Sequence, residues 1–390
     1  MNKKTTQLIH HPYAPPVGFA SPAVPVHKGS TVFFDNVAAM RSRQWLDRSA
    51  YTYGLHGTPT SFTLEERIAT LEGGTHTMLV SSGLAALTMV DIALLKSGDE
   101  VLLPNNVYGP NKAFTRTELA AWGIGHAVYD AMDAASLAAA VTPKTKLVWL
   151  EAAGSVTLEF PDLRALIRVV RERAPQAVIA LDNTWGAGIA FDAFALGIDV
   201  TIHALTKYPS GGGDVLMGAV TCRDDALYRT LALSRSRVGH GVGVNDVELV
   251  LRALPSMALR YAAQDAAGRA FAAWCQSRKE FVRVLNPALP GSPGHEHWAS
   301  LCTAAAGLVT VEVDPRFGTA QTDAFVDALK LFRIGYSWAG PISLVLPYDP
   351  KTIRGEASPY RGTLVRFCIG LEAIEDLIAD AEQALRVLAA

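Results

Sequence analysis

Short runs of apolar residues recur along the first half of the chain, separated by segments with apolar positions at helical spacing. Polar and apolar residues do not alternate within the runs, which indicates strands buried on both faces. The runs lie at residues 77–81, 101–104, 147–151, 178–182 and 199–203. Because helical segments lie between them, the pattern predicts an α/β fold with a mostly parallel sheet covered on both sides.

Several of the helical segments carry recognisable boundaries. Residues 61–74 place apolar positions on one helical face, with Ser61 as a candidate N-cap and Gly73 at the end. Residues 161–174 predict another helix, with Pro161 in its first turn.

Changes in the spacing of apolar residues divide the 390 residues into three parts. Residues 1–60 are rich in Pro, Ser and aromatic residues without periodicity, which predicts an N-terminal arm that contacts a neighbouring subunit. Residues 61–250 form the α/β domain, and residues 251–390 form a smaller α+β domain, joined by a long helical segment. The strands and final helix expected in the smaller domain lie at residues 307–313, 343–347 and 372–390.

Composition narrows the functional classes. The chain has 49% apolar and 18% charged residues and a net charge of -2, which disfavours nucleic-acid and membrane surfaces as partners. No apolar run reaches the roughly 18 residues of a membrane helix. The basic start is not followed by the apolar stretch of a secretion signal. The four cysteines lie far apart, so we expect reduced thiols and a cytoplasmic location.

Chemically competent residues stand at the ends of successive predicted strands. Glu151 and Asp182 close two of them, and Lys207 follows a third. Ligands of parallel sheets bind at this edge. Ser82 and Gly83 precede a helix, whose N-terminus suits a phosphate. A lysine for covalent attachment, an aspartate for a ring nitrogen and a phosphate site together point to pyridoxal 5'-phosphate (PLP).

Each of these residues, taken alone, is more often structural. A lysine after a strand is usually solvated, and an aspartate or a Ser-Gly pair there usually caps a turn or a helix. The run His295-Glu296-His297 resembles a metal site, but no third ligand is evident, so no metal is expected. The joint occurrence of these residues at successive strand ends is what favours PLP.

Specific motifs connect these residues to a known family. Lys207 lies in VTIHALTKYPSGGGD and Asp182 in ALDNTWGAGIAF, and the further motifs are YTYGLHGTPT, LEGG, SSGLAAL and VRFCIGLE. With this set the chain resembles the Cys/Met-metabolism PLP-dependent enzymes over nearly its whole length. The resemblance implies the PLP-dependent transferase fold type I of aspartate aminotransferase. It also implies a homotetramer of two catalytic dimers.

The resemblance assigns roles around the cofactor. Lys207 would hold PLP covalently and act as acid and base, while Asp182 would pair with the ring nitrogen. Tyr108 would stack on the ring, Tyr53 would reach the phosphate of the neighbouring subunit's cofactor, and both would take part in catalysis. The other residues expected to bind the cofactor are Ser82, Gly83, Leu84, Ser155 and Thr206.

The same resemblance places the substrate. Arg366 would bind its α-carboxylate in a bidentate manner, with two N–H donors of the guanidinium. The rest of the substrate site would be lined by Tyr336, Ser337 and Trp338. Two departures from the family pattern stand out. Leu55 stands where the family commonly has an arginine, so one expected hydrogen-bond donor to the cofactor phosphate is missing. Ala153 stands where the family usually has a proline.

Two positions indicate the type of reaction. Tyr336 and Ser155 resemble the β-eliminating branch of the family, which implies α,β-elimination of an amino-acid thioether, L-cystathionine, to homocysteine, pyruvate and ammonia. A γ-acting trans-sulfuration relative and a broad cysteine-S-conjugate lyase or cysteine desulfhydrase remain the enzyme alternatives. A ligand-binding sensor without turnover is disfavoured because Lys207 and Asp182 are both present.

Overall fold

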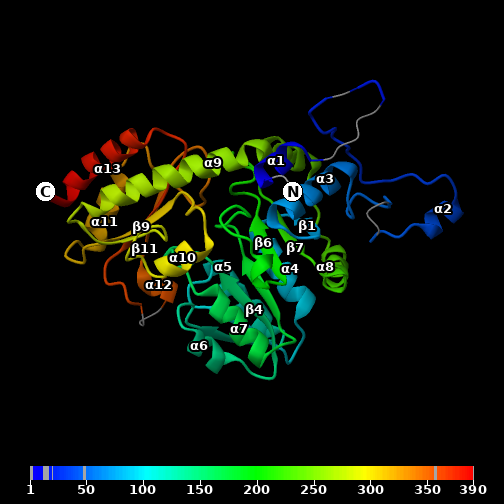
Figure 1. Cartoon of the computed structure of the whole chain (residues 1–390), viewed down its shortest axis with the longest axis horizontal. Helices are drawn as coiled ribbons and strands as arrows, with labels where there is room; N and C mark the ends of the chain where they lie inside the picture. Colours follow the sequence, from blue (N-terminus) through cyan, green and yellow to red (C-terminus); the bar gives the residue numbers. More distant parts are fainter. Residues whose placement is uncertain (1–2, 12–16, 20, 47–49, 355–357, 390) are drawn as a thin grey trace.

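A seven-stranded sheet forms the centre of the computed structural model, which describes residues 3–11, 17–19, 21–46, 50–354 and 358–389 (Figure 1). Its strand order is β1-β7-β6-β5-β4-β2-β3, and β7 alone runs antiparallel to its neighbours. The strands are β1 (His76–Val80), β2 (Glu100–Pro104), β3 (Gly125–Tyr129), β4 (Thr145–Glu151), β5 (Val178–Asp182), β6 (Val200–Ala204) and β7 (Gly218–Cys222). The predicted mostly parallel sheet is thus confirmed.

Helices cover this sheet on both faces. The helices α4 (Gly83–Leu94) and α8 (Asp225–Val238) contribute to one apolar core, and α3 (Pro59–Glu72), α6 (Ala134–Ala140) and α7 (Leu163–Arg173) contribute to the other. Within β5, Ile179 and Leu181 belong to one core and Ala180 to the other. Because both faces are buried, the strands are apolar throughout, as their sequence pattern indicates.

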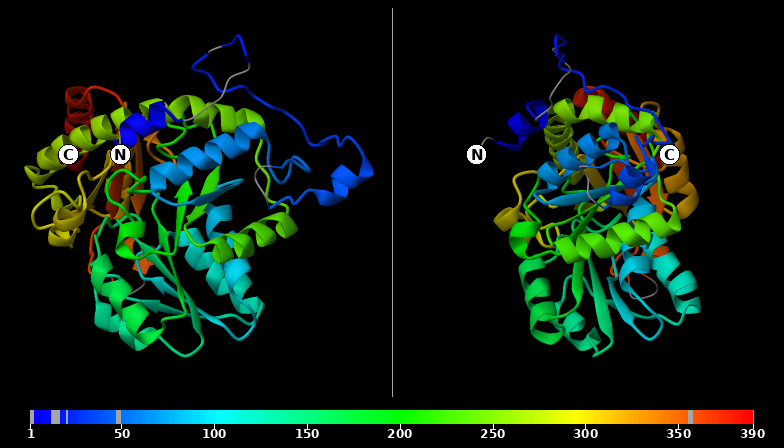
Figure 2. Two further views of the ribbon diagram at one scale, coloured as in Figure 1. Left: turned by 45° about the vertical axis from the view of Figure 1, so that its right-hand side comes forward. Right: turned by 90° about the vertical axis from the view of Figure 1, so that its right-hand side faces the viewer.

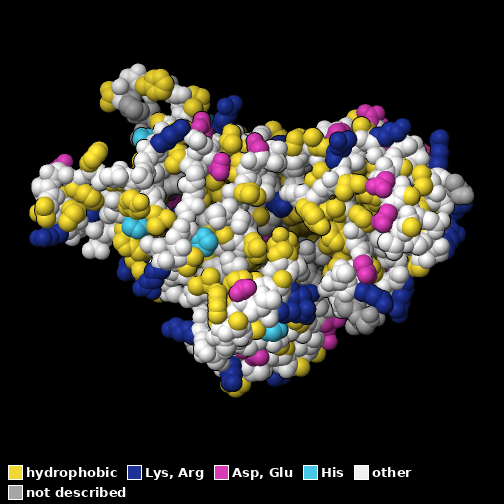
Figure 3. Space-filling model, turned by 180° about the vertical axis from the view of Figure 1, so that it is seen from behind, with side chains coloured by type: hydrophobic (Ala, Val, Ile, Leu, Met, Phe, Trp, Pro, Cys, Tyr) yellow, Lys and Arg dark blue, Asp and Glu magenta, His cyan; other side chains and the backbone are white. Residues whose placement is uncertain are grey.

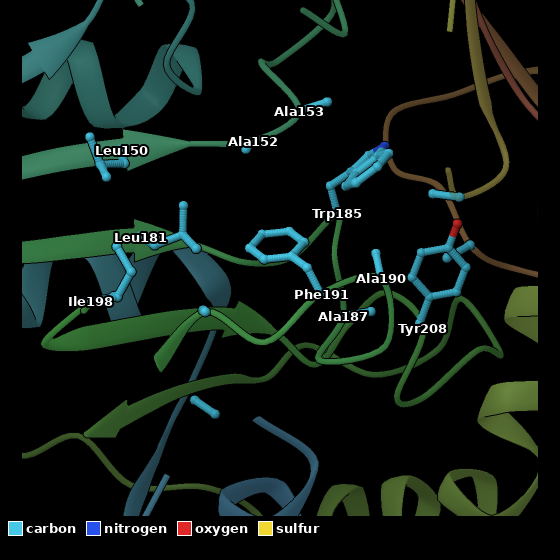
Figure 4. Close-up of a cluster of buried hydrophobic side chains, with 14 of the residues drawn as sticks. Leu150, Ala152, Ala153, Leu181, Trp185, Ala187, Ala190, Phe191, Ile198 and Tyr208 are labelled. Carbon is cyan, nitrogen blue, oxygen red and sulfur yellow. The ribbon is translucent and has the colours of Figure 1, made fainter. Parts of the chain in front are cut away.

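The second of these cores reaches the edge of the sheet where the strands end. Figure 4 shows Leu150 and Leu181 on adjacent strands, with Trp185 and Tyr208 on the loops that follow. Phe160 and Trp185 pack with their ring centroids 5.8 Å apart. Aromatic side chains therefore extend this core to the loops at the carboxyl ends of the strands.

Two helix starts differ in detail from the sequence expectation. The N-cap of α3 is Thr58, and Ser61 is the third residue of the helix, where its hydroxyl accepts a hydrogen bond from the Thr58 amide at 2.8 Å. This reciprocal arrangement is a capping box. The cap of α7 is Asp162, so Pro161 precedes the helix and does not lie within its first turn.

A smaller five-stranded sheet follows, in the order β10-β11-β12-β9-β8. Its strands are β8 (Phe281–Leu285), β9 (Leu308–Val313), β10 (Arg333–Ile334), β11 (Leu344–Tyr348) and β12 (Leu364–Cys368). The apolar core of this sheet includes residues of α11 (Thr319–Asp327) and α13 (Ile374–Ala389). Two short helices of the same region, α10 (His295–Leu301) and α12 (Pro350–Arg354), contribute no residue to this core. His295 on α10 bonds the Pro287 carbonyl oxygen at 2.9 Å.

One long helix joins the two sheets. The 33-residue α9 (Val244–Gln276) runs across the expected boundary at residue 250. Its first half contributes Val247 and Leu254 to the core of the large sheet, and its last turns contribute Phe271 and Cys275 to that of the small sheet. None of the described helices is long and apolar enough to cross a membrane.

The N-terminal region has two different parts. The short helix α1 (Lys4–Ile9) docks on the body: the Lys4 amine donates to the carbonyl oxygens of Leu71 and Gly188 at 2.8 Å, and Leu8 is buried. By contrast, α2 (Val37–Ser42) has no buried residue and stands away from the body (Figures 1 and 2). The expected arm therefore starts after a docked helix.

Candidate active site

A cavity of about 700 Å³ opens where the strands of the large sheet end. It is lined by every residue expected to bind cofactor or substrate except Tyr53, namely Ser82, Gly83, Leu84, Tyr108, Ser155, Asp182, Thr206, Lys207, Tyr336, Ser337, Trp338 and Arg366. Figure 3 shows a hollow near the middle of one face, with hydrophobic side chains around it and a basic side chain within it. Its size suits a small ligand.

Lys207 extends from the turn after β6 into this cavity. Its amine donates a hydrogen bond to Ser337 Oγ at 2.7 Å and lies 5.5 Å from the ring centroid of Trp338. Burial and the nearby positive charge of Arg366 lower the pKa of Lys207 to about 8. A useful fraction of the amine is therefore neutral near physiological pH, as a nucleophile or general base requires.

Two carboxyl groups lie side by side in the same cavity as Lys207. Asp182 and Glu151 are register partners at the ends of β5 and β4. Burial raises the pKa of Asp182, and burial and the neighbouring Asp182 raise the pKa of Glu151 well above its usual value. Asp182 accepts from the Thr184 amide at 3.0 Å, and Glu151 accepts from the Tyr108 amide at 2.7 Å. Glu151 thereby fixes the backbone that carries the Tyr108 ring.

The N-terminus of α4 supplies free donors. Ser82 caps the helix by accepting from the Ala85 amide at 3.0 Å. Within the described ranges, the amides of Gly83 and Leu84 make no hydrogen bond, and both residues line the cavity. Such a helix start favours a phosphate. Thr206, the other expected phosphate ligand, exchanges hydrogen bonds with the Met217 backbone at 3.1 and 3.3 Å.

Arg366 enters the cavity from the opposite side, on β12 of the small sheet. It is only 8% exposed, and its guanidinium carbon lies 5.3 Å from the ring centroid of Tyr348. Its Nε is buried and has no hydrogen-bond partner among the described residues. A buried guanidinium with an unused donor is suited to a carboxylate ligand, because the ligand would satisfy that donor.

A strained turn presents Ser337 to Lys207. Ser337 and Ala339 have backbone φ angles of +103° and +66°, which are unfavourable for residues with a Cβ. The turn is held by Gln264, which donates to the Gly340 carbonyl oxygen at 2.9 Å, and by the Cys368 thiol, which donates to the Ser337 carbonyl oxygen at 3.4 Å. Tyr336 is 84% exposed at its start.

Tyr53 and its neighbours lie outside the cavity of their own chain. Tyr53 is 48% exposed and does not line it. The Leu55 carbonyl oxygen accepts from Arg235 at 3.1 Å. The His56 ring stacks on Trp45 with centroids 4.6 Å apart and hydrogen-bonds Thr52 at 2.9 Å. His56 is thus held locally and does not replace the missing arginine within this chain.

The structure also adds cavity residues that sequence reasoning missed. Lys112 on α5 (Gly109–Phe114) and Arg116 on the adjoining π-helix η1 (Thr115–Leu119) both line it, as do Trp185 and Tyr348. A basic residue four positions after Tyr108 is the signal that could have pointed to Lys112, since that spacing brings it onto the same helical side. Nothing in TRTEL distinguishes Arg116 from a solvated helical residue.

Comparison with known proteins identifies the family. Residues 5–386 match the family model described as Cys/Met metabolism PLP-dependent enzyme. The chain belongs to this family. Cystathionine beta-lyase from Bordetella avium is 37% identical over 98% of this chain and 98% of its own length. Cystathionine beta-lyase from Escherichia coli strain K12 is 34% identical over 92% and 91%.

Solved structures share the fold of this Cys/Met metabolism enzyme. The structure of cystathionine gamma synthase from Xanthomonas oryzae pv. oryzae superposes with a TM-score of 0.90 at 26% identity, covering 100% of this chain and 99% of that one. Membership of the family makes the protein a PLP-dependent enzyme of the carbon–sulfur lyase group. The fold expected from the sequence is thereby confirmed.

The residues around the cavity fit PLP. Free amides at the start of α4 match its phosphate, the buried carboxyl of Asp182 matches its ring nitrogen, and the Lys207 amine matches its aldehyde. Tyr108 projects from the α5 start, whose backbone Glu151 holds, and its ring lines the same space. These groups lie at or after the ends of four strands of one sheet, β1, β2, β5 and β6, so a single sheet positions all of them.

Proposed function

We propose that the protein is a cystathionine beta-lyase, which converts L-cystathionine and water to homocysteine, pyruvate and ammonia. The proposal rests on one juxtaposition: a partly neutral Lys207 amine, held 2.7 Å from Ser337, shares a cavity with the buried Arg366, whose Nε has no hydrogen-bond partner among the described residues. A base and a carboxylate anchor in one cavity are what an enzyme needs to deprotonate the α-carbon of an amino acid.

The side chains divide the work as follows. PLP, when bound, supplies an electron sink for the charge that develops on the substrate α-carbon. Asp182, fixed by the Thr184 amide, holds the proton on the ring nitrogen that this chemistry requires. Arg366 binds the α-carboxylate and so orients the α-hydrogen toward Lys207. The Lys207 amine removes this proton, and its ammonium form returns a proton to the departing thiolate.

The choice of β over γ chemistry rests on Tyr336 and Ser155. Both line the cavity, and both match the β-eliminating branch. The relatives named above at 37% and 34% identity are described as cystathionine beta-lyases. The likeness to a γ-synthase structure, at 26% identity, makes a γ-acting enzyme the alternative.

Product analysis tests the proposal. Purified enzyme loaded with PLP is incubated with L-cystathionine, and the keto acid and the thiol are identified. Pyruvate with homocysteine is expected, and 2-oxobutyrate as the main keto acid would overturn the assignment. Lys207→Ala serves as the matched control, because it removes the base while the surrounding fold is retained.

We also infer that the working unit is an assembly of copies of this chain. Tyr53 is exposed and lies outside its own cavity, and Phe33 in the arm is 90% exposed. Large exposed aromatic residues on a projecting segment favour a protein partner. A second copy would bring Tyr53 to the neighbouring phosphate site, and the family resemblance extends such a dimer to a homotetramer of two dimers.

A further inference from the structure

The cavity carries more positive charge than the chemistry at Lys207 uses. Its lining includes the four basic residues Lys112, Arg116, Lys207 and Arg366 but only the two carboxyl groups of Glu151 and Asp182. The PLP phosphate would be held at the start of α4, and Arg366 would bind the substrate α-carboxylate. Lys112 and Arg116 are then the basic residues of the lining to which no anionic group is assigned.

Lys112 is already committed to the protein. Its ammonium donates to the carbonyl oxygens of Asn105 at 2.9 Å and Ile353 at 3.0 Å. Burial, Arg116 and Arg354 lower its pKa. Lys112 thus ties α5 to α12, and its remaining capacity for a ligand is small.

Arg116 is not committed. In the part of the chain that the structure describes, its side chain makes no hydrogen bond or ion pair, although the residue lines the cavity and is exposed to solvent. It lies two turns beyond Tyr108, on η1, where the backbone changes from an α-helix to a π-helix. Single π-turns of this kind frequently occur at functional sites.

We propose that Arg116 binds the negatively charged far end of the substrate, the part that leaves with the sulfur. This rests on the proposed function and narrows its substrate class to L-cysteine thioethers whose S-substituent carries a carboxylate. Arg366 on the small domain holds the α-carboxylate, and Arg116 on the large domain holds the distal one. A guanidinium suits this role because its paired N–H donors match a carboxylate.

The proposal is tested with two ligands that differ in one group. S-(2-carboxyethyl)-L-cysteine has a distal carboxylate, and S-propyl-L-cysteine has a methyl group in its place. The dissociation constant of each for the PLP-loaded enzyme is measured from the change in cofactor absorption, and released pyruvate is measured in parallel. The variants are Arg116→Gln and Arg116→Lys, with Arg168→Gln, an exposed arginine on α7, as the control.

Arg116→Gln is expected to raise the dissociation constant of the carboxylated ligand about 10-fold, the usual size of a lost charged hydrogen bond. The S-propyl ligand should change less than about twofold on the same scale. Arg116→Lys should recover part of the loss, and Arg168→Gln should change neither ligand. An equal change for both ligands, or no change, overturns the proposal. Discrimination between the ligands without pyruvate release supports Arg116 but overturns the lyase assignment.

Discussion

The amine of Lys207 owes its reactivity to its neighbours. It is the burial of the side chain, with the positive charge of Arg366, that lowers its pKa to about 8. Trp338 and Ser337 then fix its position without supplying a compensating negative charge. The same residue can therefore attack an aldehyde and remove a proton without a separate base.

This makes the pH dependence of cofactor uptake predictable. Only the neutral amine attacks PLP, so the uptake rate of cofactor-free enzyme should rise with pH and level off above about 8. Arg366→Gln removes a charge that lowers the pKa of Lys207, and the midpoint should move to higher pH. Stopped-flow absorption of bound PLP measures both, with Arg168→Gln as the control. An unshifted midpoint in Arg366→Gln would contradict the electrostatic coupling.

The residues expected to bind cofactor or substrate were predictable from the sequence to different degrees. Asp182 and Lys207 were accessible because parallel strands end at one edge of a sheet, so their order along the chain brings them together. Arg366 lies inside a buried strand, where an arginine is unexpected, and only the VRFCIGLE motif pointed to it. Arg116 gave no signal, since its importance depends on a cavity wall formed by segments distant in sequence.

At the scale of elements, five apolar strands of the large sheet, β1, β2, β4, β5 and β6, were predictable, and β3 and β7 were not. The edge strand β3 has mostly exposed or half-buried residues, so it lacks a continuous apolar run. The strand β7 (GAVTC) is fully buried but small and partly polar. Gly218 in β7 has to be glycine, because a Cβ there would lie 2.2 Å from the Ser82 carbonyl oxygen. Close packing of this kind is not encoded in a local pattern.

One buried contact between α4 and β4 makes stability depend on pH. Trp149 Nε1 on β4 donates to Asp91 Oδ1 on α4 at 2.8 Å, and the other oxygen of Asp91 has no partner among the described residues. Burial raises the pKa of Asp91 to about 7. The folded protein therefore keeps a proton between about pH 4 and 7 that the unfolded chain releases. Stability falls as pH rises through this window.

Asp91→Asn should remove this dependence. The asparagine oxygen still accepts from Trp149, but the group cannot ionise. The thermal unfolding temperature of the variant, minus that of the parent at the same pH, should increase as pH rises from 5 to 8. This difference should be smallest at pH 5. Thermal unfolding at both pH values, with the same PLP saturation, gives the comparison. Parallel pH profiles for the two proteins would show that Asp91 does not titrate in this range.

At the scale of the whole molecule, the position of Tyr53 predicts that active sites are shared between subunits. Lys207→Ala and Tyr53→Ala should each be strongly impaired. When the two variants are mixed, dissociated and reassembled, hybrid assemblies contain sites with an intact Lys207 and an intact Tyr53 from the other chain. Pyruvate production should then reappear. If mixed assemblies form and stay inactive, Tyr53 acts within its own chain or not at all.

The replacement of an arginine by Leu55 makes a second prediction at this scale. The family resemblance implies that an arginine at this position would reach the phosphate of the neighbouring subunit's cofactor, and a charged hydrogen bond is worth about 1.5–3 kcal/mol. Leu55→Arg should therefore retain PLP longer than the parent during dialysis against cofactor-free buffer. Leu55→Met, which adds no charge, should behave like the parent. Equal retention in both variants would mean that the phosphate is already fully satisfied.

The division of the cavity between two domains has an evolutionary consequence. The groups that fit the cofactor, such as Lys207 and Asp182, precede α9 in the chain, whereas Arg366 and the Tyr336–Trp338 turn follow it. Arg366 and Ser337 also set the pKa and the position of Lys207, so mutations there change substrate recognition and cofactor reactivity together. Tyr336 is 84% exposed, and mutations at this position can change which amino acid is recognised while Lys207 keeps these contacts. A lineage can therefore acquire new substrates at Tyr336 by small steps, each of which leaves a working catalyst.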